Sequence, residues 1–580
     1  MNYSELVGYL LKKRGYNTQE LQDRFLYPDY DRHTYDPFLM SDMEIAVERI
    51  LQTIQNDEKI CVYSDYDADG IPGATILHDF FKKIKYLHNV TFYIPHRHDE
   101  GYGLHIPALE KIKNEGVVLL ITVDLGITAV KEVDFANSIG LEVIITDHHE
   151  PLEELPNAVA VINPKVPKKQ SKLSDNTYPD TMLCGCATAF KLIQGILMVL
   201  RSERILENNN LDLKKIIGKT LIPPIGWEKW LLDMVGIATL SDMVPLVNEN
   251  RVFAIYGLRV LRKTRRPGLL ALFQIMKIRQ AYLTEDDVVF SITPRLNAAS
   301  RMAHPEVAFQ LLTTDDSTQA RDIALELSRL NDERKLEVAR AMKEVHKKMS
   351  ARSSLPKIIV TGDPSWSAGV LGLIASKIVD EYDRTVFVWG TDGELVKGSC
   401  RARDGDHVVD LMTTIANKFD HYGGHEGAGG FSMKRENVHF LEDELNAIAG
   451  EVVHNKNESD NSQEYDIKLY PEQVTYDLYK QLQCFAPFGL GNRSPLVCIP
   501  EFQPEKVQVF GKTKEHLEIV VTSGIQPLRA IQFFTKPERY GIDSDNPQKI
   551  TLFGNIEYSF FMGKGELRMR IIDVLRVVNE

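Results

Sequence analysis

The stretch KICVYSDYDADG (59–70) opens with six residues of mostly apolar or β-branched type and then turns at once to acid and glycine. Two further stretches, VVLLITVDLGIT (117–128) and LEVIITDHHE (141–150), repeat this form. Continuous apolar runs are typical of strands buried on both faces of a parallel sheet. The intervening segments are long enough for crossover helices. The sequence therefore predicts an α/β fold with a parallel, doubly wound sheet.

Each of these predicted strands ends in acidic or imidazole side chains. Because ligands bind outside the carboxyl ends of parallel strands, we expect the following residues to converge in one crevice: Asp65, Asp67, Asp69, Asp124, Asp147, His148 and His149. Several carboxylates crowded together repel one another unless cations lie among them. The pattern therefore predicts a centre for two divalent cations, and imidazole ligands favour Mn²⁺ over Mg²⁺.

The competing interpretation of DYDADG is an EF-hand calcium loop. Position twelve of that loop would be Ile76 instead of a bidentate glutamate, and a strand precedes the motif where a helix is required. A two-cation centre of the type that hydrolyses phosphodiesters fits the residues better.

The remaining chain divides at changes of composition. Residues 317–352 are nearly free of Gly and Pro, which predicts one connecting helix of about 50 Å at 1.5 Å per residue. Five strand-like runs follow a polar segment near the C-terminal end and favour a small barrel of the OB type. The expected order is an N-terminal cap (1–50), the catalytic α/β domain (51–316), the connecting helix (317–352), a smaller α/β domain (353–450), a linker (451–465) and a C-terminal OB-type β-barrel (466–580).

Composition indicates the class of protein. The 580 residues carry a net charge of −13, so the overall field repels nucleic acid, and a polyanionic substrate needs local cations. The six cysteines include no CxxC pair, and no apolar run reaches the length of a membrane span. We therefore expect a soluble, cytoplasmic protein without a membrane partner.

Four segments carry a family resemblance, and their order and spacing make it specific. DYDADG, TVDLGIT (122–128), ITDHHE (145–150) and ATLSDMVPL (238–246) resemble the four motifs of the DHH phosphoesterase superfamily. GSCRARDG (398–405) and GGHEGAGG (423–430) are similar to its accessory DHHA1 domain. Three more segments resemble the RecJ branch of this superfamily: PRLNAASRM (294–302), PSWSAGVLGLIASKI (364–378) and PFGLGNRSP (487–495).

The resemblance implies roles for individual residues. Matched to the superfamily's metal ligands are Asp67, Asp69, Asp124, His148 and Asp242, with Asp124 bridging two cations, Mn²⁺ or Mg²⁺. Asp65 and Asp147 match flanking acids in a supporting position, and His149 matches a contact to the scissile phosphate.

The resemblance also implies contacts to DNA. Ser399, Arg401 and Arg97 match a pocket for the terminal 5′-phosphate. Further strand contacts are expected at Arg295, Asn297, Arg301, Gly424 and His425. The basic run RVLRKTRRPG (259–268) either tracks a strand backbone or forms a solvated helix face. Aromatic residues near the end either stack on bases or fill the barrel core: Phe510, Phe533, Phe534, Tyr558, Phe560 and Phe561.

Two positions depart from the superfamily pattern. Tyr63 stands where some members have a histidine, so the first cation is expected to rely more on carboxylates and water. Ser300 stands where glycine is usual.

The resemblance implies a 5′→3′ exonuclease that degrades single-stranded DNA to 5′-mononucleotides in repair and recombination. It also implies a helicase and a single-strand-binding protein as partners, and a monomer is expected because one chain supplies every part. Two alternatives remain: a phosphodiesterase for short oligonucleotides or cyclic dinucleotides, and a non-catalytic single-strand-binding replication scaffold. The C-terminal barrel favours the exonuclease over the phosphodiesterase for short substrates. The four intact acidic motifs favour it over the non-catalytic scaffold.

Overall fold

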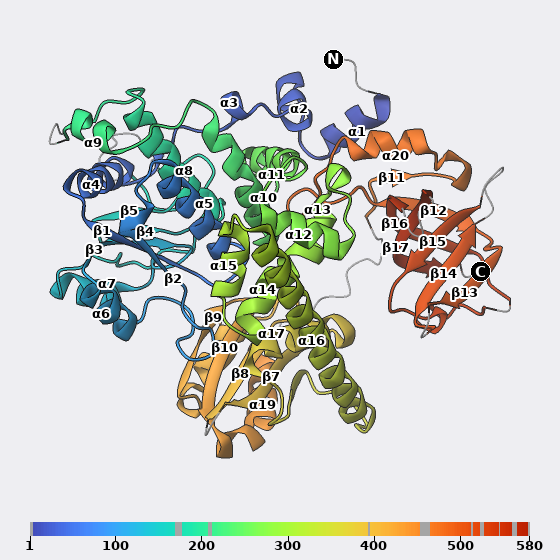
Figure 1. Cartoon of the computed structure of the whole chain (residues 1–580). Helices are drawn as coiled ribbons and strands as arrows, with labels where there is room; N and C mark the ends of the chain where they lie inside the picture. Colours follow the sequence, from blue (N-terminus) through green and yellow to red (C-terminus); the bar gives the residue numbers. More distant parts are fainter. Residues whose placement is uncertain are drawn as a thin grey trace. The chain divides into compact units, whose positions relative to one another are not determined.

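The computed structural model describes residues 4–168, 177–206, 211–392, 395–452, 464–511, 514–521, 527–544, 546–559 and 565–577. The chain forms two compact units, each assembled from separate stretches (Figure 1). The larger unit takes in residues 35–242 and 256–459. The smaller unit takes in residues 1–34, 243–255 and 460–580.

The first sheet of the larger unit has five parallel strands in the order β2-β1-β3-β4-β5. Three of them lie where the sequence predicts strands: β1 (Lys59–Ser64), β3 (Val117–Val123) and β4 (Glu142–Thr146). The edge strands β2 (Val90–Tyr93) and β5 (Ala160–Ile162) were not predicted, because four and three residues are too few to give a pattern. The three acid-tipped strands are thus neighbours in the middle of the sheet.

Helices cover both faces of this sheet (Figure 1). Side chains of α6 (Ile106–Asn114) and α7 (Val130–Ser138) pack into one apolar core with alternate residues of β1, β3 and β4. The helices α4 (Met43–Asn56), α5 (Gly70–Lys83) and α8 (Gly185–Leu200) lie on the other side. Both faces of the central strands are therefore buried, as their continuous apolar runs require.

A helical region follows the first sheet. Its main elements are α9 (Leu213–Lys219), α10 (Leu232–Ser241), α11 (Asn248–Leu261), α12 (Pro267–Met276), α13 (Glu285–Asp287), α14 (Thr293–Met302) and α15 (Glu306–Thr313). The predicted long helix is α16 (Ser317–Ser350), whose 34 residues begin after the N-cap Asp316.

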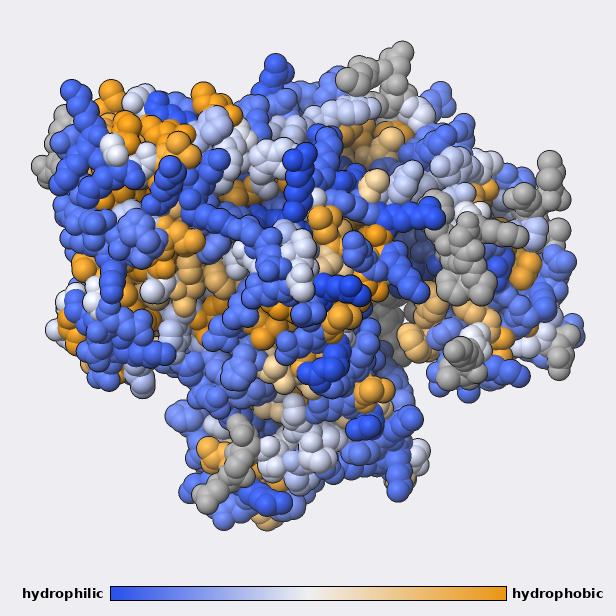
Figure 2. Space-filling view, viewed as in Figure 1, coloured by the Kyte–Doolittle hydropathy of each residue, from blue (hydrophilic) through white to orange (hydrophobic). Residues whose placement is uncertain are grey.

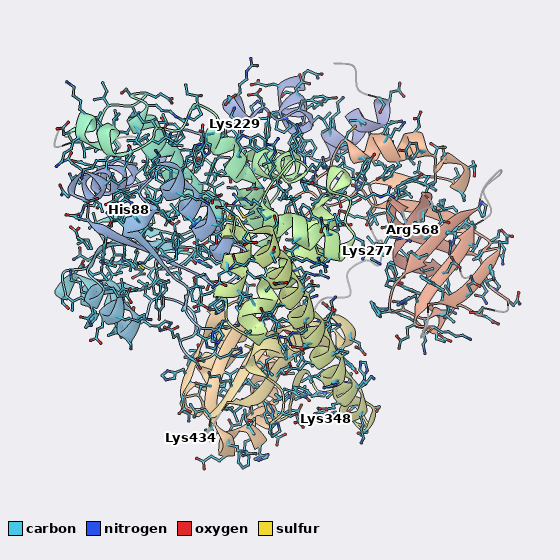
Figure 3. All side chains as sticks on the ribbon, in the orientation of Figure 1. His88, Lys229, Lys277, Lys348, Lys434 and Arg568 are labelled. Carbon is cyan, nitrogen blue, oxygen red and sulfur yellow. The ribbon has the colours of Figure 1, made fainter. Side chains whose placement is uncertain are left out.

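The second α/β segment belongs to the same unit. Its sheet has the order β6-β7-β8-β10-β9, with β6 and β7 parallel and the other pairs antiparallel. The strands are β6 (Ile358–Gly362), β7 (Thr385–Asp392), β8 (Leu395–Arg401), β9 (His421–His425) and β10 (Ala428–Lys434), and the helices are α17 (Ala368–Tyr382), α18 (Val408–Thr414) and α19 (Leu441–Val452). Lys348, labelled in Figure 3, ties the C-terminal part of α16 to this segment by donating to the Gly362 carbonyl at 2.6 Å.

The smaller unit is built around a seven-stranded sheet with the order β11-β12-β16-β17-β15-β14-β13. The five predicted strands are present as β13 (Lys506–Phe510), β14 (His516–Val521), β15 (Leu528–Gln532), β16 (Ile550–Ser559) and β17 (Glu566–Arg576). The strands β11 (Ile467–Lys468) and β12 (Val497–Phe502) and the helix α20 (Tyr476–Gln483) complete it.

The N-terminal helices α1 (Glu5–Lys13) and α2 (Gln19–Leu26) also belong to the smaller unit. Val7, Leu10, Leu11 and Phe25 share an apolar core with residues of this seven-stranded sheet. Residues 1–50 were expected to cap the segment that follows them, whereas residues 1–34 belong to the smaller unit. The short helix α3 (Tyr30–His33) ends this N-terminal part of the smaller unit.

Residues 243–255 are held in the smaller unit by the loop that precedes β12. The Leu246 N–H donates to the Leu490 carbonyl at 2.8 Å. The buried guanidinium of Arg251 donates to three carbonyls, those of Phe25, Phe485 and Ala486. The PFGLGNRSP segment (487–495) therefore packs against residues 243–255.

No helix among the described residues combines the length and the apolar character needed to cross a membrane. Figure 2 shows a face on which hydrophilic residues predominate and apolar ones gather in small patches. Most of the predicted linker, residues 453–463, lies outside the described part of the chain, as do Phe560 and Phe561.

Candidate active site

The acidic residues predicted to converge do so at the carboxyl ends of β1, β3 and β4. The N–H groups of Asp65, Asp124 and Asp147 donate to the last carbonyl of the neighbouring strand, at 3.1, 2.9 and 3.1 Å. These bonds align the three acids along one edge of the sheet. Asp124 has a positive φ of 62°, a conformation that aspartate tolerates better than most residues.

The ligand atoms fall into three groups of closely spaced side chains, each within 4.8 Å. These groups are Asp65 with Asp67 and Asp124, then Asp69 with His148 and Asp242, and finally Asp124 with His148 and His149. Asp124 and His148 each take part in two of these groups, and of the two only the carboxylate of Asp124 has two oxygens to offer to two cations. Asp65, expected as a flanking acid in a supporting position, lies in the first of these groups.

Asp69 is held by the first turn of α8. The N–H groups of Gly185 and Cys186 donate to its two carboxylate oxygens at 2.6 and 2.8 Å. A Cβ at Gly185 would lie 2.5 Å from the Cβ of Asp124, so only glycine allows this helix to approach both acids. Asp67 is fixed locally, since one of its oxygens accepts the N–H groups of Asp69 and Gly70.

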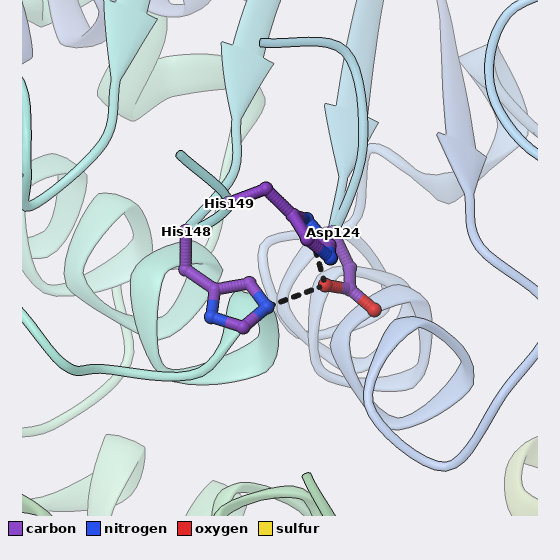
Figure 4. A group of neighbouring side chains, drawn as sticks. All are labelled: Asp124, His148 and His149. Carbon is purple, nitrogen blue, oxygen red and sulfur yellow. Dashed lines mark ion pairs between the residues drawn. The ribbon is translucent and has the colours of Figure 1, made fainter. Parts of the chain in front are cut away.

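Figure 4 shows how His148 and His149 flank Asp124. The Nε2 atom of His148 lies 3.2 Å from Asp124 Oδ1, 3.6 Å from Asp242 Oδ2 and 3.8 Å from Asp69 Oδ2. Burial lowers the pKa of His148 to about 3, so at neutral pH its ring is uncharged and Nε2 is available as a metal ligand.

Asp147 has a different role from the other acids. One oxygen accepts the N–H of Ile127, and the other accepts the N–H of His148 and contacts His149 Nδ1 at 2.7 Å. Burial alone would raise the pKa of Asp147, but its bond with His149 holds that pKa below the usual value. Asp147 therefore orients His149 and is not grouped with the ligands.

For Asp65, Asp124 and Asp242, the effects that favour a charged carboxylate do not outweigh burial. Burial, followed by repulsion from neighbouring acids, raises the pKa of Asp65 and Asp124 well above the usual value and that of Asp242 to about 9. Within this cluster, four buried atoms have no hydrogen-bond partner among the described residues: Asp65 Oδ1, Asp124 Oδ1, His148 Nε2 and Asp242 Oδ2. Divalent cations would satisfy these atoms and the crowded charge together.

Two tyrosines border the centre. Tyr63 is fully buried, stacks on Tyr93 and donates to the Gly103 carbonyl, so it belongs to the core. Tyr102 was not identified from the sequence. Its hydroxyl lies 3.3 Å from both the Asp124 carbonyl and His149 Nδ1, and its ring is 48% exposed. The only local sign was an aromatic residue between two glycines, which does not reveal its neighbours.

A cavity of about 580 Å³ lies between the first sheet's loops and the second α/β segment, within the larger unit. Arg97 and Tyr102 line one wall, and Lys397 and Gly423 line the other. The guanidinium of Arg97 lies over the Tyr66 ring at 4.9 Å.

Ser399 and Arg401 project from the same face of β8, as their spacing predicts. The Arg401 Nη1 donates to Ser399 Oγ at 3.2 Å. Both side chains pack over α17, where a Cβ at Gly372 would lie 3.0 Å from Arg401 Nη2 and 3.3 Å from Ser399 Oγ. The segment PSWSAGVLGLIASKI thus provides the floor beneath this pair.

The three predicted positions on α14 differ in their surroundings. Arg295 donates to Ser328 Oγ of α16 and to the Ser291 carbonyl, so it braces two helices. Asn297 has a buried Oδ1 without a partner among the described residues. Arg301 donates to the Gly369 carbonyl at 3.0 Å, and burial lowers its pKa to about 9.

Gly424 and His425 lie on β9, the exposed edge strand of the second sheet. Neither lines the cavity described above. A Cβ at Gly424 would lie 2.3 Å from the Ala428 carbonyl, so the requirement for glycine comes from the adjoining strand. Gly423, by contrast, faces open space.

Two cations of the basic run at 259–268 have structural partners, whereas Arg259, Lys263 and Arg265 are exposed. Arg266 is paired with Asp233 and Asp79, and Arg262 donates to the Leu283 carbonyl. Among the candidate stacking residues of the smaller unit, Phe534 is 81% exposed and Phe533 is 39% exposed, whereas Tyr558 packs on Tyr476.

Comparison with known proteins identifies three family descriptions along the chain. Residues 59–221 match the DHH family, N-terminal domain, residues 355–451 match the DHHA1 domain, and residues 465–573 match the RecJ OB domain.

Relatives extend over most of the chain. The single-stranded-DNA-specific exonuclease RecJ of Bacillus subtilis (strain 168) is 35% identical over 535 residues, which cover 92% of this chain and 63% of that protein. The protein of the same name from Escherichia coli (strain K12) is 30% identical over 478 residues, which cover 79% of this chain and 77% of that protein. A crystal structure of RecJ in complex with Mn²⁺ from Thermus thermophilus has the same fold, with a TM-score of 0.78, 23% identity, and coverage of 100% of this chain and 76% of that one.

Proposed function

Because the chain belongs to the RecJ family, we propose that it is a metal-dependent exonuclease that degrades single-stranded DNA from the 5′ end to 5′-mononucleotides. The observation that carries this proposal is the set of grouped ligands around Asp124, which lies in the same unit as the arginines of the second α/β segment. A role in DNA repair and recombination follows from this activity.

The donor set fits two divalent cations. One would lie among Asp65, Asp67 and Asp124, and the other among Asp69, Asp124, His148 and Asp242. When bound, such a pair supplies a nucleophilic water and stabilises the attacking and leaving oxygens of a phosphodiester. Carboxylates with imidazole suit Mn²⁺, and Mg²⁺ is the second candidate.

The chain's own side chains position the substrate. His149 is oriented by Asp147 through Nδ1, which leaves its Nε2 to contact the scissile phosphate. Ser399 and Arg401 offer a hydroxyl and a guanidinium fork for the terminal 5′-phosphate, and Arg97, which lines the cavity, offers a second guanidinium. Holding that phosphate one nucleotide from the scissile bond favours removal of single nucleotides.

We keep the domain boundaries 51–316, 317–352, 353–450 and 466–580 as part of the proposal, except that residues 243–255 belong to the smaller unit. The family matches over 59–221, 355–451 and 465–573 support the first, third and fourth of these domains. We also propose a monomeric, cytoplasmic protein that works beside a helicase and a single-strand-binding protein. All six cysteines are free of disulfides, which agrees with a reducing compartment.

The test is digestion of a 5′-labelled strand, a 3′-labelled strand and a blunt duplex, each with Mn²⁺, with Mg²⁺ and with EDTA. We expect immediate release of labelled mononucleotide from the 5′-labelled strand alone, and no release in EDTA. Cleavage of cyclic dinucleotides in preference to long strands would instead support a short-oligonucleotide phosphodiesterase. Retention of the strand without cleavage would support a binding scaffold.

A further inference from the structure

Tyr66 stands between the candidate metal ligands Asp65 and Asp67 but is not grouped with them as a ligand. It is 7% exposed, and it lines the cavity of about 580 Å³ that Arg97 also lines. Its hydroxyl has no hydrogen-bond partner among the described residues. A buried hydroxyl ordinarily has such a partner, because an unmet donor is costly. The cavity is therefore the place where a partner of this hydroxyl would lie.

The backbone on both sides of Tyr66 is fixed. Before it, the Asp65 N–H donates to the Val123 carbonyl at 3.1 Å. After it, a carboxylate oxygen of Asp67 accepts the Gly70 N–H at 3.1 Å. The ring is thus carried by a turn that the sheet and the start of α5 hold in place. A binding group held in this way loses little conformational entropy when its ligand arrives.

Arg97 lies against the same ring. Its guanidinium carbon is 4.9 Å from the centre of the Tyr66 ring. No ion pair or hydrogen bond within the described part of the chain occupies this guanidinium. Both side chains line the cavity, so an unbonded hydroxyl and an unpaired guanidinium border one space. A phosphate suits this pair, because it has several oxygens and its negative charge strengthens a hydrogen bond from either donor.

We propose that the Tyr66 hydroxyl donates a hydrogen bond to the terminal 5′-phosphate, the same group that Arg97 binds. This inference rests on the proposed function, which places that phosphate with Arg97, Ser399 and Arg401. At neutral pH a tyrosine hydroxyl is protonated, so it can donate to a phosphate oxygen. The ring has a second effect, because its face supports the Arg97 guanidinium. A strand with a 5′-hydroxyl end offers no partner for either donor, so Tyr66 contributes to the choice between the two ends.

The experiment measures kcat/KM on a 5′-phosphorylated thymidine dodecamer and on the same strand with a 5′-hydroxyl end, and takes the ratio of the two values. Tyr66→Phe removes the hydroxyl and keeps the ring. We expect the ratio to fall about tenfold, as for the loss of one hydrogen bond to a charged group. Tyr66→Leu also removes the support of Arg97, so the ratio should fall further.

A change in the ratio separates a contact from a disturbed metal centre, because damage to the neighbouring ligands would lower kcat/KM on both strands equally. Tyr86→Phe is the matched control in the larger unit. The Tyr86 hydroxyl is bonded to two backbone carbonyls, and Tyr86 does not line the cavity. This variant should keep the wild-type ratio. An unchanged ratio in Tyr66→Phe, or an equal loss on both strands, would overturn the proposal.

A binding measurement makes the test independent of turnover. Fluorescence anisotropy gives the affinity of the full chain for the two strands, each labelled at its 3′ end, in EDTA. The wild-type chain should bind the 5′-phosphorylated strand more tightly, and Tyr66→Phe should reduce this preference about tenfold. Equal preferences in the two proteins, or no preference in wild type, would overturn the proposal. A wild-type chain that digests neither strand counts against the proposed function, and the affinity ratio then decides the role of Tyr66.

Discussion

The larger unit contains two regions of opposite unbalanced charge. Asp65 and Asp124 are buried at the strand ends, Asp242 follows α10, and each of the three has an oxygen without a hydrogen-bond partner among the described residues. On α14 and β8, Arg301 and Arg401 are partly buried beside another arginine, Arg97. The two sets are not paired off against each other, although both belong to one unit. Such a site is complementary to a substrate that carries anionic groups. Divalent cations would lie between these anions and the acids.

Arg266, in the same unit, is a cation whose charge is balanced by neighbouring acids. Arg266 is paired with Asp79 and Asp233, and although burial opposes its charge, these acids hold its pKa above the usual value. Burial of Arg301 is not compensated in this way, and its pKa is lowered. Arg266 therefore stabilises the fold, whereas Arg301 keeps a charge that a ligand can neutralise.

Among substitutions in the acidic region, Asp124→Asn should reduce activity the most. We expect the exonuclease rate to fall about a thousandfold or more, the effect of losing one preorganised electrostatic group from a catalytic site. Single-turnover digestion measures the rate, and circular dichroism verifies the fold. Asp134→Asn, an exposed acid on α7, is the matched control. A rate within tenfold of wild type would rule out a central position for Asp124.

The acidic region should also respond to metal removal in a pH-dependent way. An acid whose pKa is raised by folding binds its proton more tightly in the folded state, so the stability it contributes at low pH is lost as pH rises through that pKa. For Asp242, with a pKa of about 9, we expect the EDTA-treated protein to lose stability from pH 7 to 9. Mn²⁺ at a hundred times its Kd should add about 2.7 kcal/mol. Thermal melts measure both, and a metal effect that does not grow with pH would contradict this.

Within the cationic region, Arg401→Ala should weaken selection of 5′-phosphorylated ends. A hydrogen bond to a charged group contributes about 1.5–3 kcal/mol, so the preference over 5′-hydroxyl ends should fall about ten- to a hundredfold. Competition between the two substrates measures this ratio. Arg403→Ala, two residues along the chain and paired with Asp383, should keep the preference.

The comparison of Asp124 with Asp147 sharpens the assignment of roles. Asp147 holds His149, so Asp147→Asn should lower activity about 10- to 100-fold, as for a group that orients a neighbouring side chain. Metal titration followed by calorimetry should then show the same number of bound cations as in wild type. Loss of one cation would place Asp147 among the ligands.

The smallest expected effect lies in the other unit, at Phe534. Base stacking on an exposed aromatic ring contributes about 1–3 kcal/mol, and we expect the low end for a single ring. Phe534→Ala should weaken binding of a long single strand about fivefold and leave dinucleotide cleavage unchanged. Fluorescence anisotropy measures the first and product release the second. An unaltered affinity would remove Phe534 from the strand path.

The sequence predicted what local patterns encode. The strands β1, β3 and β4, the helix α16 and five strands of the smaller unit coincide with predicted elements. The acids at the strand ends were foreseen because topology alone brings them together. Tyr102 was missed because its neighbours, Asp124 and His149, come from segments that no local pattern links to it.

The smaller unit joins residues 1–34 with residues 460–580. During synthesis at about 5–20 residues per second, the helices α1 and α2 emerge roughly 20–90 seconds before β11 to β17 exist. For that interval Val7, Leu10 and Phe25 lack the core that later buries them. The order of translation thus makes the N-terminal helices a transient client for chaperones, and a chain shortened after residue 459 would keep that exposed face permanently.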